Sequence, residues 1–219
     1  LICTYNAEKF IKSTLFSVFN QTYKNVEILI LDNASTDKTV EIIQDLARSN
    51  GPILTASVRK RPSVCLIQYK KNIGPYEGIN VLLNHAKGAY IAINDHDDIW
   101  HSKKLEKQVD FLEKHKEYIG SGTAIINWYE KYKKYIYRSQ PTRADVAWHT
   151  SLVFRNKGYK YDTTVKVGTD FYFTKNILCG NKKLIYNFQD PFVLRRIFKG
   201  KQNLSGQWMK KISLMDIIK

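Results

Sequence analysis

Three aspartates, Asp95, Asp97 and Asp98, lie within four residues of one another, directly after an apolar run at residues 90–93. Carboxylates this close repel one another and raise each other's pKa unless a cation lies among them. Mg²⁺ and Mn²⁺ prefer oxygen ligands, and Mg²⁺ commonly combines one or two carboxylates with substrate phosphates. The spacing therefore indicates a divalent-metal site for a phosphate-bearing substrate. The alternative is a solvated acidic loop that caps the following helix.

Short apolar segments alternate with amphipathic segments in the first half of the chain. The apolar segments are typical of buried strands, and the amphipathic ones repeat apolar residues at helical spacing. The expected strands are residues 1–3, 26–31, 64–69 and 90–93, and the expected helices are residues 8–20, 38–49, 76–86 and 102–115. This order predicts an α/β fold with an open, mainly parallel sheet, right-handed crossovers and flanking helices.

Polar loops follow three of the expected strands. They comprise residues 4–6, residues 32–33 and residues 95–98. Ligands of open parallel sheets bind beyond the carboxyl ends of the strands. We therefore expect these loops to converge on one edge of the sheet and to form one site.

The second half predicts a smaller, mixed region of the same domain. Strands are expected within residues 120–137, 148–155, 183–187 and 192–197, with a helix at residues 171–178. Residues 128–138 interleave aromatic residues with lysines. This pattern is typical of a hairpin covering the functional edge, or of a surface that stacks on sugars or bases. Residues 207–219 read as an amphipathic helix that either docks on the protein or lies on an anionic membrane surface.

The composition is that of a globular protein with a large excess of positive charge. The 219 residues are 43% hydrophobic and 25% charged, the formal net charge is +15 and the pI is about 9.6. The charge favours acidic partners: nucleic acid, anionic lipid headgroups or a phosphate-bearing substrate. No apolar run approaches the roughly 20 residues that a membrane-spanning helix needs.

The cysteines and the first residues bear on the cellular setting. Cys3, Cys65 and Cys179 are far apart and odd in number, which argues against a disulfide framework or a metal site and favours a reducing cytoplasm. The chain carries no signal peptide and begins at Leu1, inside an expected strand, so we expect this strand to be truncated and residues to precede it.

Five motifs, in order, resemble those of the family 2 glycosyltransferases, which share the GT-A fold. Cys3-Thr4-Tyr5-Asn6 is similar to the family's usual Pro-Thr-Tyr-Asn after its first strand. The other similar segments are residues 20–23 at the end of the first helix, residues 30–39 (Val-Asp-Asp-Gly-Ser-Thr-Asp-x-Thr in the family), residues 72–74 (Asn-x-Gly) and residues 87–98 (Gly-Glu-Tyr-Ile, then Asp-x-Asp). The resemblance covers nearly the whole chain, and motif context of this kind supports each single motif.

The resemblance implies a role for each matching residue. Asp32 would accept a hydrogen bond from the nucleotide base and Tyr5 would stack on it. Asp97 would bind a Mn²⁺ or Mg²⁺ ion that bridges the diphosphate, and Asp95 would contact the ribose or the metal. The implied nucleotide-binding set is Thr4, Tyr5, Asn6, Asp32, Asn72 and Asp95, and the implied metal-binding pair is Asp97 and Asp95.

Asp170 follows Thr169 where the family has a Glu-Asp or similar pair before a helix. By the resemblance it would be the general base that deprotonates the acceptor hydroxyl. That hydroxyl is a poor nucleophile, and a carboxylate within hydrogen-bond reach activates it. A base on the face opposite the leaving diphosphate gives inversion at the anomeric carbon. The alternative for Asp170 is a favourable charge at the start of the next helix.

The chain departs from the family at two positions that bear on the nucleotide. Ile79 stands where the family often has an arginine, which removes a positive contact that Lys70 or Lys71 would have to replace. Phe198 stands at the position of a histidine in an Arg-x-His stretch. If that histidine holds metal or diphosphate, the contact is absent or supplied by charge from Arg195, Arg196 or Lys199.

Together these features predict a metal-dependent, inverting glycosyltransferase of hexosyltransferase type. The donor would be a UDP-, dTDP- or GDP-linked sugar, and the acceptor a hydroxyl of a lipid-linked or polysaccharide intermediate at the cytoplasmic face of a membrane. We expect residues 1–118 to form the donor-binding half, residues 119–198 the acceptor half and residues 199–219 a basic tail.

Two competing functions remain open at this stage. A non-catalytic relative that binds a sugar nucleotide would fit the departures at Ile79 and Phe198. A nucleic-acid-binding protein would fit the net charge, but carboxylates at the functional edge would repel a polyanion. Two side chains also have a purely structural interpretation. Tyr5 could be an aromatic residue that packs in the protein, and His149 could be a structural histidine instead of a contact to the acceptor.

Overall fold

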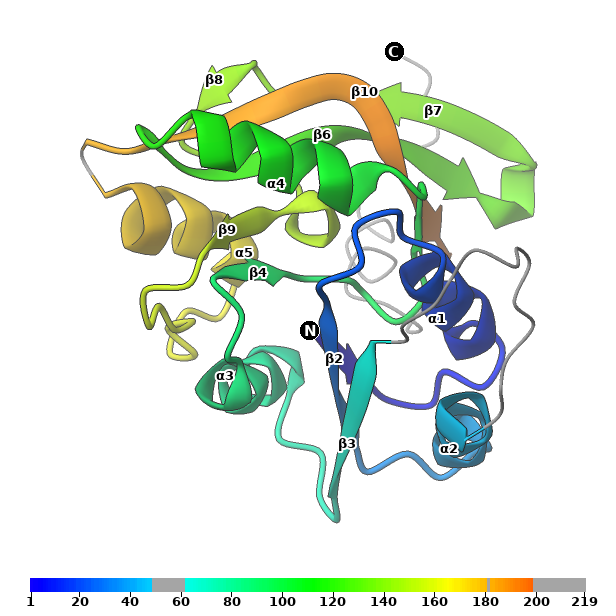
Figure 1. Cartoon of the computed structure of the whole chain (residues 1–219). Helices are drawn as coiled ribbons and strands as arrows, with labels where there is room; N and C mark the ends of the chain where they lie inside the picture. Colours follow the sequence, from blue (N-terminus) through cyan, green and yellow to red (C-terminus); the bar gives the residue numbers. More distant parts are fainter. Residues whose placement is uncertain (49–61, 181, 199–219) are drawn as a thin grey trace.

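The computed structural model describes residues 1–48, 62–180 and 182–198 (Figure 1). In the first half, β1 (Ile2–Thr4), β2 (Glu27–Asn33), β3 (Ser63–Tyr69) and β4 (Tyr90–Ala92) alternate with α1 (Ile11–Phe19), α2 (Thr39–Arg48) and α3 (Pro75–His85). Then follow β5 (Ile99–Trp100), α4 (Lys104–Lys114), β6 (Tyr118–Tyr129), β7 (Lys134–Arg138), β8 (Arg143–Ala144), β9 (Val153–Arg155), α5 (Thr169–Tyr172) and β10 (Leu184–Ile197). The expected helices and strands of the first half are all confirmed, with ends shifted by a few residues.

A parallel sheet of order β1-β2-β3 carries the first two polar loops. Its central strand β2 is buried over Ile28 to Asn33 and is a nearly continuous apolar run until Asp32. The parallel register sets Thr4 opposite Asp32 at the carboxyl ends of β1 and β2. The first two loops therefore start side by side, as the sequence predicted.

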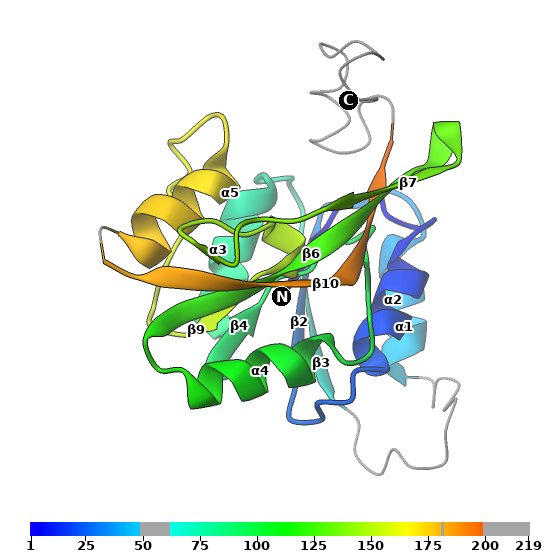
Figure 2. The same ribbon diagram turned by 90° about the horizontal axis from the view of Figure 1, so that it is seen from above.

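Alternating side chains of β2 pack into two separate clusters, one on each face of the sheet. Ile28 and Ile30 pack with residues of α1 and α2, whereas Leu29 and Leu31 pack with residues of α3 and with Ile91 of β4. Figure 2 shows α1 and α2 together on one side of β2 and β3, and α3 on the other. A parallel strand buried on both faces needs apolar residues in every position, which explains its sequence.

The strand β4 joins a second sheet instead of the first, which differs from the four-strand parallel sheet that we predicted. It pairs antiparallel with β9, in a sheet of order β4-β9-β6-β10-β5 to which β7 and β8 are added. Two backbone hydrogen bonds still tie it to β1: Leu1 N to Ala92 O at 2.7 Å, and Asn94 N to Leu1 O at 3.0 Å. The short β4 is therefore the seam between the two sheets.

The second sheet is built around β6 and β10, which run parallel over their length. The hairpin expected within residues 120–137 is confirmed as β6 and β7. Residues 183–187 and 192–197, which we predicted as separate strands, form the single strand β10, with register irregularities around Pro191. The expected helix at 171–178 is α5 followed by a π-helix, Phe173–Cys179. The predicted helix at residues 207–219 lies outside the described residues.

A groove of about 900 Å³ lies at the amino ends of the strands. It is lined by the first residues of β2 and β4 and by one face of α4, and Asp32, Asp95 and Asp97 do not line it. None of the helices in the described parts of the chain is long and apolar enough to cross a membrane. The three polar loops lie at the opposite, carboxyl ends of β1, β2 and β4, where ligands of open parallel sheets bind.

Asp37 ties the first two loops together at the start of α2. Its carboxylate accepts hydrogen bonds from the backbone N–H of Thr39 at 3.0 Å and of Glu8 at 3.1 Å, and Glu8 accepts one from the backbone N–H of Lys38 at 3.2 Å. The Thr39 hydroxyl in turn accepts a hydrogen bond from the backbone N–H of Ala7 at 2.7 Å. Burial works against ionisation of Asp37, but the hydrogen bonds from Thr39 and Glu8 outweigh it and lower its pKa.

We expect Asp37→Ala to lower the free energy of unfolding by about 1–2 kcal/mol at pH 7, as for the loss of a helix cap. Because the folded-state pKa is lowered, this contribution is present above the unfolded pKa and is lost as the pH falls through the folded one. Urea unfolding at pH 7 and at acidic pH measures both values. Asp45→Ala, at an exposed position of the same helix, is the control. An equal loss at both pH values would contradict a role for the ionised carboxylate.

Candidate active site

The acidic loop after β4 is folded tightly against β10. The backbone N–H of Asp98 donates to Asp95 O at 3.2 Å, and Asp98 Oδ1 accepts a hydrogen bond from the backbone N–H of Arg196 at 3.0 Å. The two residues of β5 then pair antiparallel with β10, through Ile99 and Trp100. This pairing holds the aspartates beside the two arginines of β10.

Negative charge is concentrated in this loop. Asp97 and Asp98 are only 6% and 1% exposed. Burial, followed by the charges of Asp97 and Asp95, raises the pKa of Asp98 well above its usual range, although the Arg195 charge opposes the shift. Asp98 Oδ2 is buried and has no hydrogen-bond partner within residues 1–48, 62–180 and 182–198. Carboxylates crowded in this way favour a bound cation.

Asp95 is held by a residue from the second half of the chain. His149 lies in a short 3-10 turn before β9, and its Nδ1 is 3.1 Å from Asp95 Oδ1. Burial opposes the charging of both groups, but their mutual attraction outweighs it, so that the pKa of His149 is raised and that of Asp95 lowered. The imidazole ring lies edge-on to Tyr76 and Tyr161.

The loops after β1 and β2 lie next to the acidic loop. Asp32 and Asp95 are both close enough to Cys3 that their charges add to the effect of burial, which raises the pKa of the thiol to about 12. His96 Nδ1 also lies 3.4 Å from Cys3 O. The structure therefore brings Asp32 and Asp95, which are far apart in the sequence, to the two sides of the end of β1.

The side chains in these two loops differ in what they leave available to a ligand. Tyr5 is 45% exposed, whereas Thr4 and Asp32 are buried. Asp32 Oδ2 accepts the backbone N–H of Ser35 at 3.1 Å, but Asp32 Oδ1 and Thr4 Oγ1 are buried without a hydrogen-bond partner in the part of the chain that the structure describes. Asn6 has a φ of 49° and its Oδ1 accepts the backbone N–H of Thr36 at 2.8 Å, so that it bridges the two loops.

Asn72 lies on the same edge, and its side-chain oxygen is engaged in hydrogen bonds that stabilise the loops of the protein itself. Asn72 Oδ1 accepts hydrogen bonds from Asn33 Nδ2 at 2.9 Å and from the backbone N–H of Gly74 at 2.8 Å. Asn33 Oδ1 accepts the backbone N–H of Ile73 at 2.9 Å. These bonds fix the loop between β3 and α3 against the end of β2.

Asp170 acts electrostatically on the same side chains as Asp95. It is the second residue of α5, which begins at Thr169 after Gly168, and it is half-buried. Burial, then the charges of Asp170 and Asp95, raise the pKa of Tyr76. The charges of Asp95 and Asp170 also both raise the pKa of His149. The predicted base and the acidic loop therefore face one cluster of aromatic side chains.

The two family departures occupy packing positions. Ile79 is 3% exposed and lies in the cluster beneath α3. Phe198 is 6% exposed, and its ring centroid is 4.8 Å from that of Phe10 at the start of α1. Arg195 interacts electrostatically with Asp95, Asp98 and His149. Lys199 lies outside the described residues.

The donor set suits a metal ion only in combination with a ligand. Within the described residues, no group of three or more His, Cys, Asp or Glu side chains is arranged to hold a metal ion. Asp95 and Asp97 lie in one loop whose third carboxylate, Asp98, has a buried, unsatisfied oxygen. Two carboxylates completed by phosphate oxygens and water are an ordinary Mg²⁺ environment, so the residues fit the expected ion.

The fold is similar to that of solved GT-A glycosyltransferases. TarS of S. aureus (residues 1–349), in complex with UDP-GlcNAc, has a TM-score of 0.69 and 18% identity over 94% of this chain and 59% of that chain. The mannosyltransferase PcManGT of Pyrobaculum calidifontis, in complex with GDP-Man and Mn²⁺, has a TM-score of 0.67 and 17% identity over 96% and 59%. The fold is therefore GT-A, as predicted.

The chain belongs to glycosyl transferase family 2, whose model matches residues 1–184. It is 38% identical over 122 residues to the putative glycosyltransferase EpsE of Bacillus subtilis, and the aligned residues cover 56% of this chain and 40% of EpsE. It is 36% identical over 128 residues to WfaP of Escherichia coli, a UDP-Glc:alpha-D-GlcNAc-diphosphoundecaprenol beta-1,3-glucosyltransferase. The aligned residues cover 58% of this chain and 45% of WfaP. The chain thus spans less than half the length of these relatives.

We expect Asp98→Asn to stabilise the metal-free protein, measured by urea unfolding in EDTA. Because the folded-state pKa of Asp98 is raised, the wild type loses stability as the pH rises from the unfolded pKa to the folded one. The asparagine removes this loss, which is about 1.4 kcal/mol for each unit of pKa shift, so its advantage should be larger at pH 7 than at pH 4. Asp110→Asn, on the exposed face of α4, is the control. A variant less stable than wild type at pH 7 would mean that the charge of Asp98 is fully compensated.

Proposed function

We propose that the protein is an inverting, metal-dependent glycosyltransferase that moves a sugar from a nucleoside-diphosphate donor to an acceptor hydroxyl. The observation that carries this proposal is the acidic loop after β4, in which Asp95 is hydrogen-bonded to His149 at 3.1 Å while Asp97 and Asp98 are buried. The charges of Asp95 and Asp170 both raise the pKa of His149 and of Tyr76. A metal-binding carboxylate and a separate carboxylate base near the same side chains would suit sugar transfer. The neighbours in complex with UDP-GlcNAc and with GDP-Man and Mn²⁺ support it.

The loops after β1 and β2 would bind the nucleoside. Tyr5 has an exposed ring that can stack on a base, and the unpaired Asp32 Oδ1 can accept an N–H from its edge. A buried acceptor without a partner costs free energy in the empty protein, and a ligand donor removes that cost. Thr4 and Asn6 would shape the floor and the rim of this pocket, and Asn72 would support it through Asn33 and Gly74.

Asp97 and Asp95 would hold the ion together with the diphosphate. A bound divalent ion neutralises the charge that grows on the leaving diphosphate. Arg195, whose charge reaches Asp95 and Asp98, would add positive charge at the same place without a metal bond. This arginine would also replace a contact that the family places at the position of Phe198.

Asp170 would take the proton of the acceptor hydroxyl. Asp170, the second residue of α5, would lie on the far side of the sugar from the diphosphate, and a base on that side would give inversion. The relatives WfaP and the putative teichuronic acid biosynthesis glycosyltransferase TuaG of Bacillus subtilis suggest an acceptor in cell-surface polysaccharide or glycolipid synthesis. The net charge of +15 suits an anionic, lipid-linked acceptor at the cytoplasmic face of a membrane.

A thermal-shift screen of UDP, GDP, dTDP and their sugars, with and without Mn²⁺, tests the donor class. A ligand at about one hundred times its dissociation constant stabilises the folded state by roughly 2.7 kcal/mol. We expect at least one nucleotide to stabilise the protein, and to do so more strongly with Mn²⁺. If single-stranded oligonucleotides stabilise it instead and no nucleotide does, the proposal is wrong.

Asp97→Asn and Asp170→Asn separate the two roles. We expect Asp97→Asn to abolish the Mn²⁺-dependent part of nucleotide binding. We expect Asp170→Asn to bind nucleotide and Mn²⁺ like wild type but to hydrolyse the donor sugar about 10²- to 10⁴-fold more slowly, the usual contribution of a general base. Asp110→Asn is again the exposed control. Wild-type protein that binds the donor but never cleaves it would favour a non-catalytic relative.

A further inference from the structure

His149 is the second-half residue that holds the carboxylate of Asp95. The distance of 3.1 Å from Nδ1 to Asp95 Oδ1 spans 54 positions of sequence. This hydrogen bond engages one carboxylate oxygen and leaves the other for a ligand. The contact is therefore made to the residue that the proposed function places beside the ribose and the metal ion.

The segment around His149 is connected by three further hydrogen bonds to residues that flank the acidic loop in the sequence. Trp100 Nε1 donates to Thr150 O at 3.0 Å, Thr150 Oγ1 donates to Asn94 Oδ1 at 3.3 Å, and the backbone N–H of Ile93 donates to Leu152 O at 3.3 Å. These bonds lie on both sides of Asp95 in the sequence. The imidazole therefore approaches Asp95 from a segment that cannot shift independently of it.

The ring itself packs against a pair of stacked tyrosines, Tyr76 and Tyr161. Its centroid lies 6.0 Å from that of Tyr76 and 5.8 Å from that of Tyr161, in both cases edge-on. Tyr161 is in turn stacked on Phe173, at 3.9 Å, and its backbone is held by two hydrogen bonds to the Asn80 side chain. His149 Nε2 is buried and has no partner among the described residues. Among the described residues, the hydrogen bond of the imidazole is therefore made through Nδ1, to Asp95.

We propose that His149 is a positioning residue that orients the Asp95 carboxylate toward the metal ion and diphosphate of the donor. The inference rests on the proposed function and goes beyond it, because it gives a role in the donor site to the acceptor half. Nδ1–H donates to Asp95 Oδ1 and fixes the carboxylate plane before the donor arrives. Partners of this kind, which orient a metal ligand without touching the metal, change metal affinity by roughly 10- to 100-fold when they are removed.

A pair of amide substitutions tests whether the Nδ1 position is what matters. In His149→Asn the amide nitrogen occupies the place of Nδ1, and in His149→Gln it occupies the place of Nε2. The measurement is the Mn²⁺ concentration at half-maximal thermal stabilisation, with a saturating amount of whichever of UDP, GDP and dTDP stabilises the wild type. We expect this midpoint to rise roughly 10- to 100-fold in the glutamine variant and to stay within about threefold in the asparagine variant.

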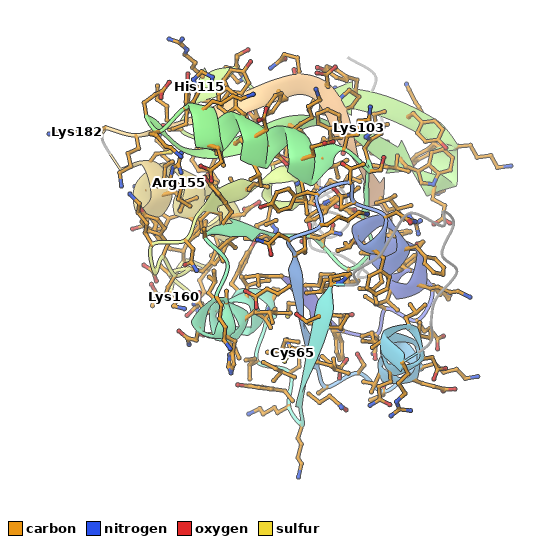
Figure 3. The ribbon with its side chains drawn as sticks, in the orientation of Figure 1. Cys65, Lys103, His115, Arg155, Lys160 and Lys182 are labelled. Carbon is orange, nitrogen blue, oxygen red and sulfur yellow. The ribbon has the colours of Figure 1, made fainter. Side chains whose placement is uncertain are left out.

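A merely structural role would give a different pattern. Loss of packing lowers the melting temperature of both variants without ligand, and leaves the Mn²⁺ midpoint unchanged. His115→Gln is the matched control, because His115 Nδ1 also faces a carboxylate, Glu117 Oε1 at 3.3 Å, but on the outer surface at the end of α4 (Figure 3). We expect its midpoint to equal that of the wild type.

The outcomes separate this inference from the proposed function. If the wild type binds nucleotide with Mn²⁺ and His149→Gln has the wild-type midpoint, the positioning role is overturned and the proposed function stands. An asparagine variant as impaired as the glutamine variant also overturns it, because the donor at the Nδ1 position would then not suffice. If no diphosphate binds the wild type with Mn²⁺, both ideas fail together.

Discussion

Crowding of three neighbouring carboxylates at the end of β4, of which Asp97 and Asp98 are buried, is the constraint on which the rest of the site depends. Like charges in a poorly solvated loop destabilise the folded state unless other groups compensate them. The protein supplies the backbone N–H of Arg196 and the charge of Arg195 from β10, and the imidazole of His149 from the turn before β9. Each of these groups comes from the second half of the chain, so the arrangement of the acidic loop depends on residues of both halves.

The dependence of the acidic loop on both halves of the chain accounts for the short length of β4 and β5, the strands on either side of the loop. β4 has three residues and β5 has two, and both pair with strands of the second sheet while Leu1 joins β4 to β1. A longer β4 in the parallel sheet would carry the aspartates past the ends of β1 and β2. Instead the chain turns at once, and Asp95 stays beside Cys3 and Asp32. The position of the acidic loop and the packing of the two sheets are thus set by the same few residues.

The sequence predicted what is periodic or locally encoded, and missed what depends on distant partners. The amphipathic helices, the buried strand β2 and the three convergent loops follow from patterns within about ten residues. β5 was missed because two residues carry no period, and β10 was divided because Gln189, Asp190 and Pro191 read as a turn although they lie within the strand. His149 was interpreted as a structural histidine because its partner, Asp95, is 54 positions away and a lone histidine gives no spacing signal.

The positions where the chain departs from its family show how a functional position can become a packing position without loss of the site. Ile79 and Phe198 are both buried, and the Phe198 ring packs in a tilted arrangement against Phe10 at the start of α1. A charged or imidazole side chain at either place would have to be desolvated or would have to turn outward toward a ligand. Arg195 already lies within electrostatic reach of Asp95, Asp98 and His149, so positive charge is retained beside the acidic loop. The chemistry that a family motif represents is therefore better judged from the charges that surround the acidic loop than from the identity of any one residue.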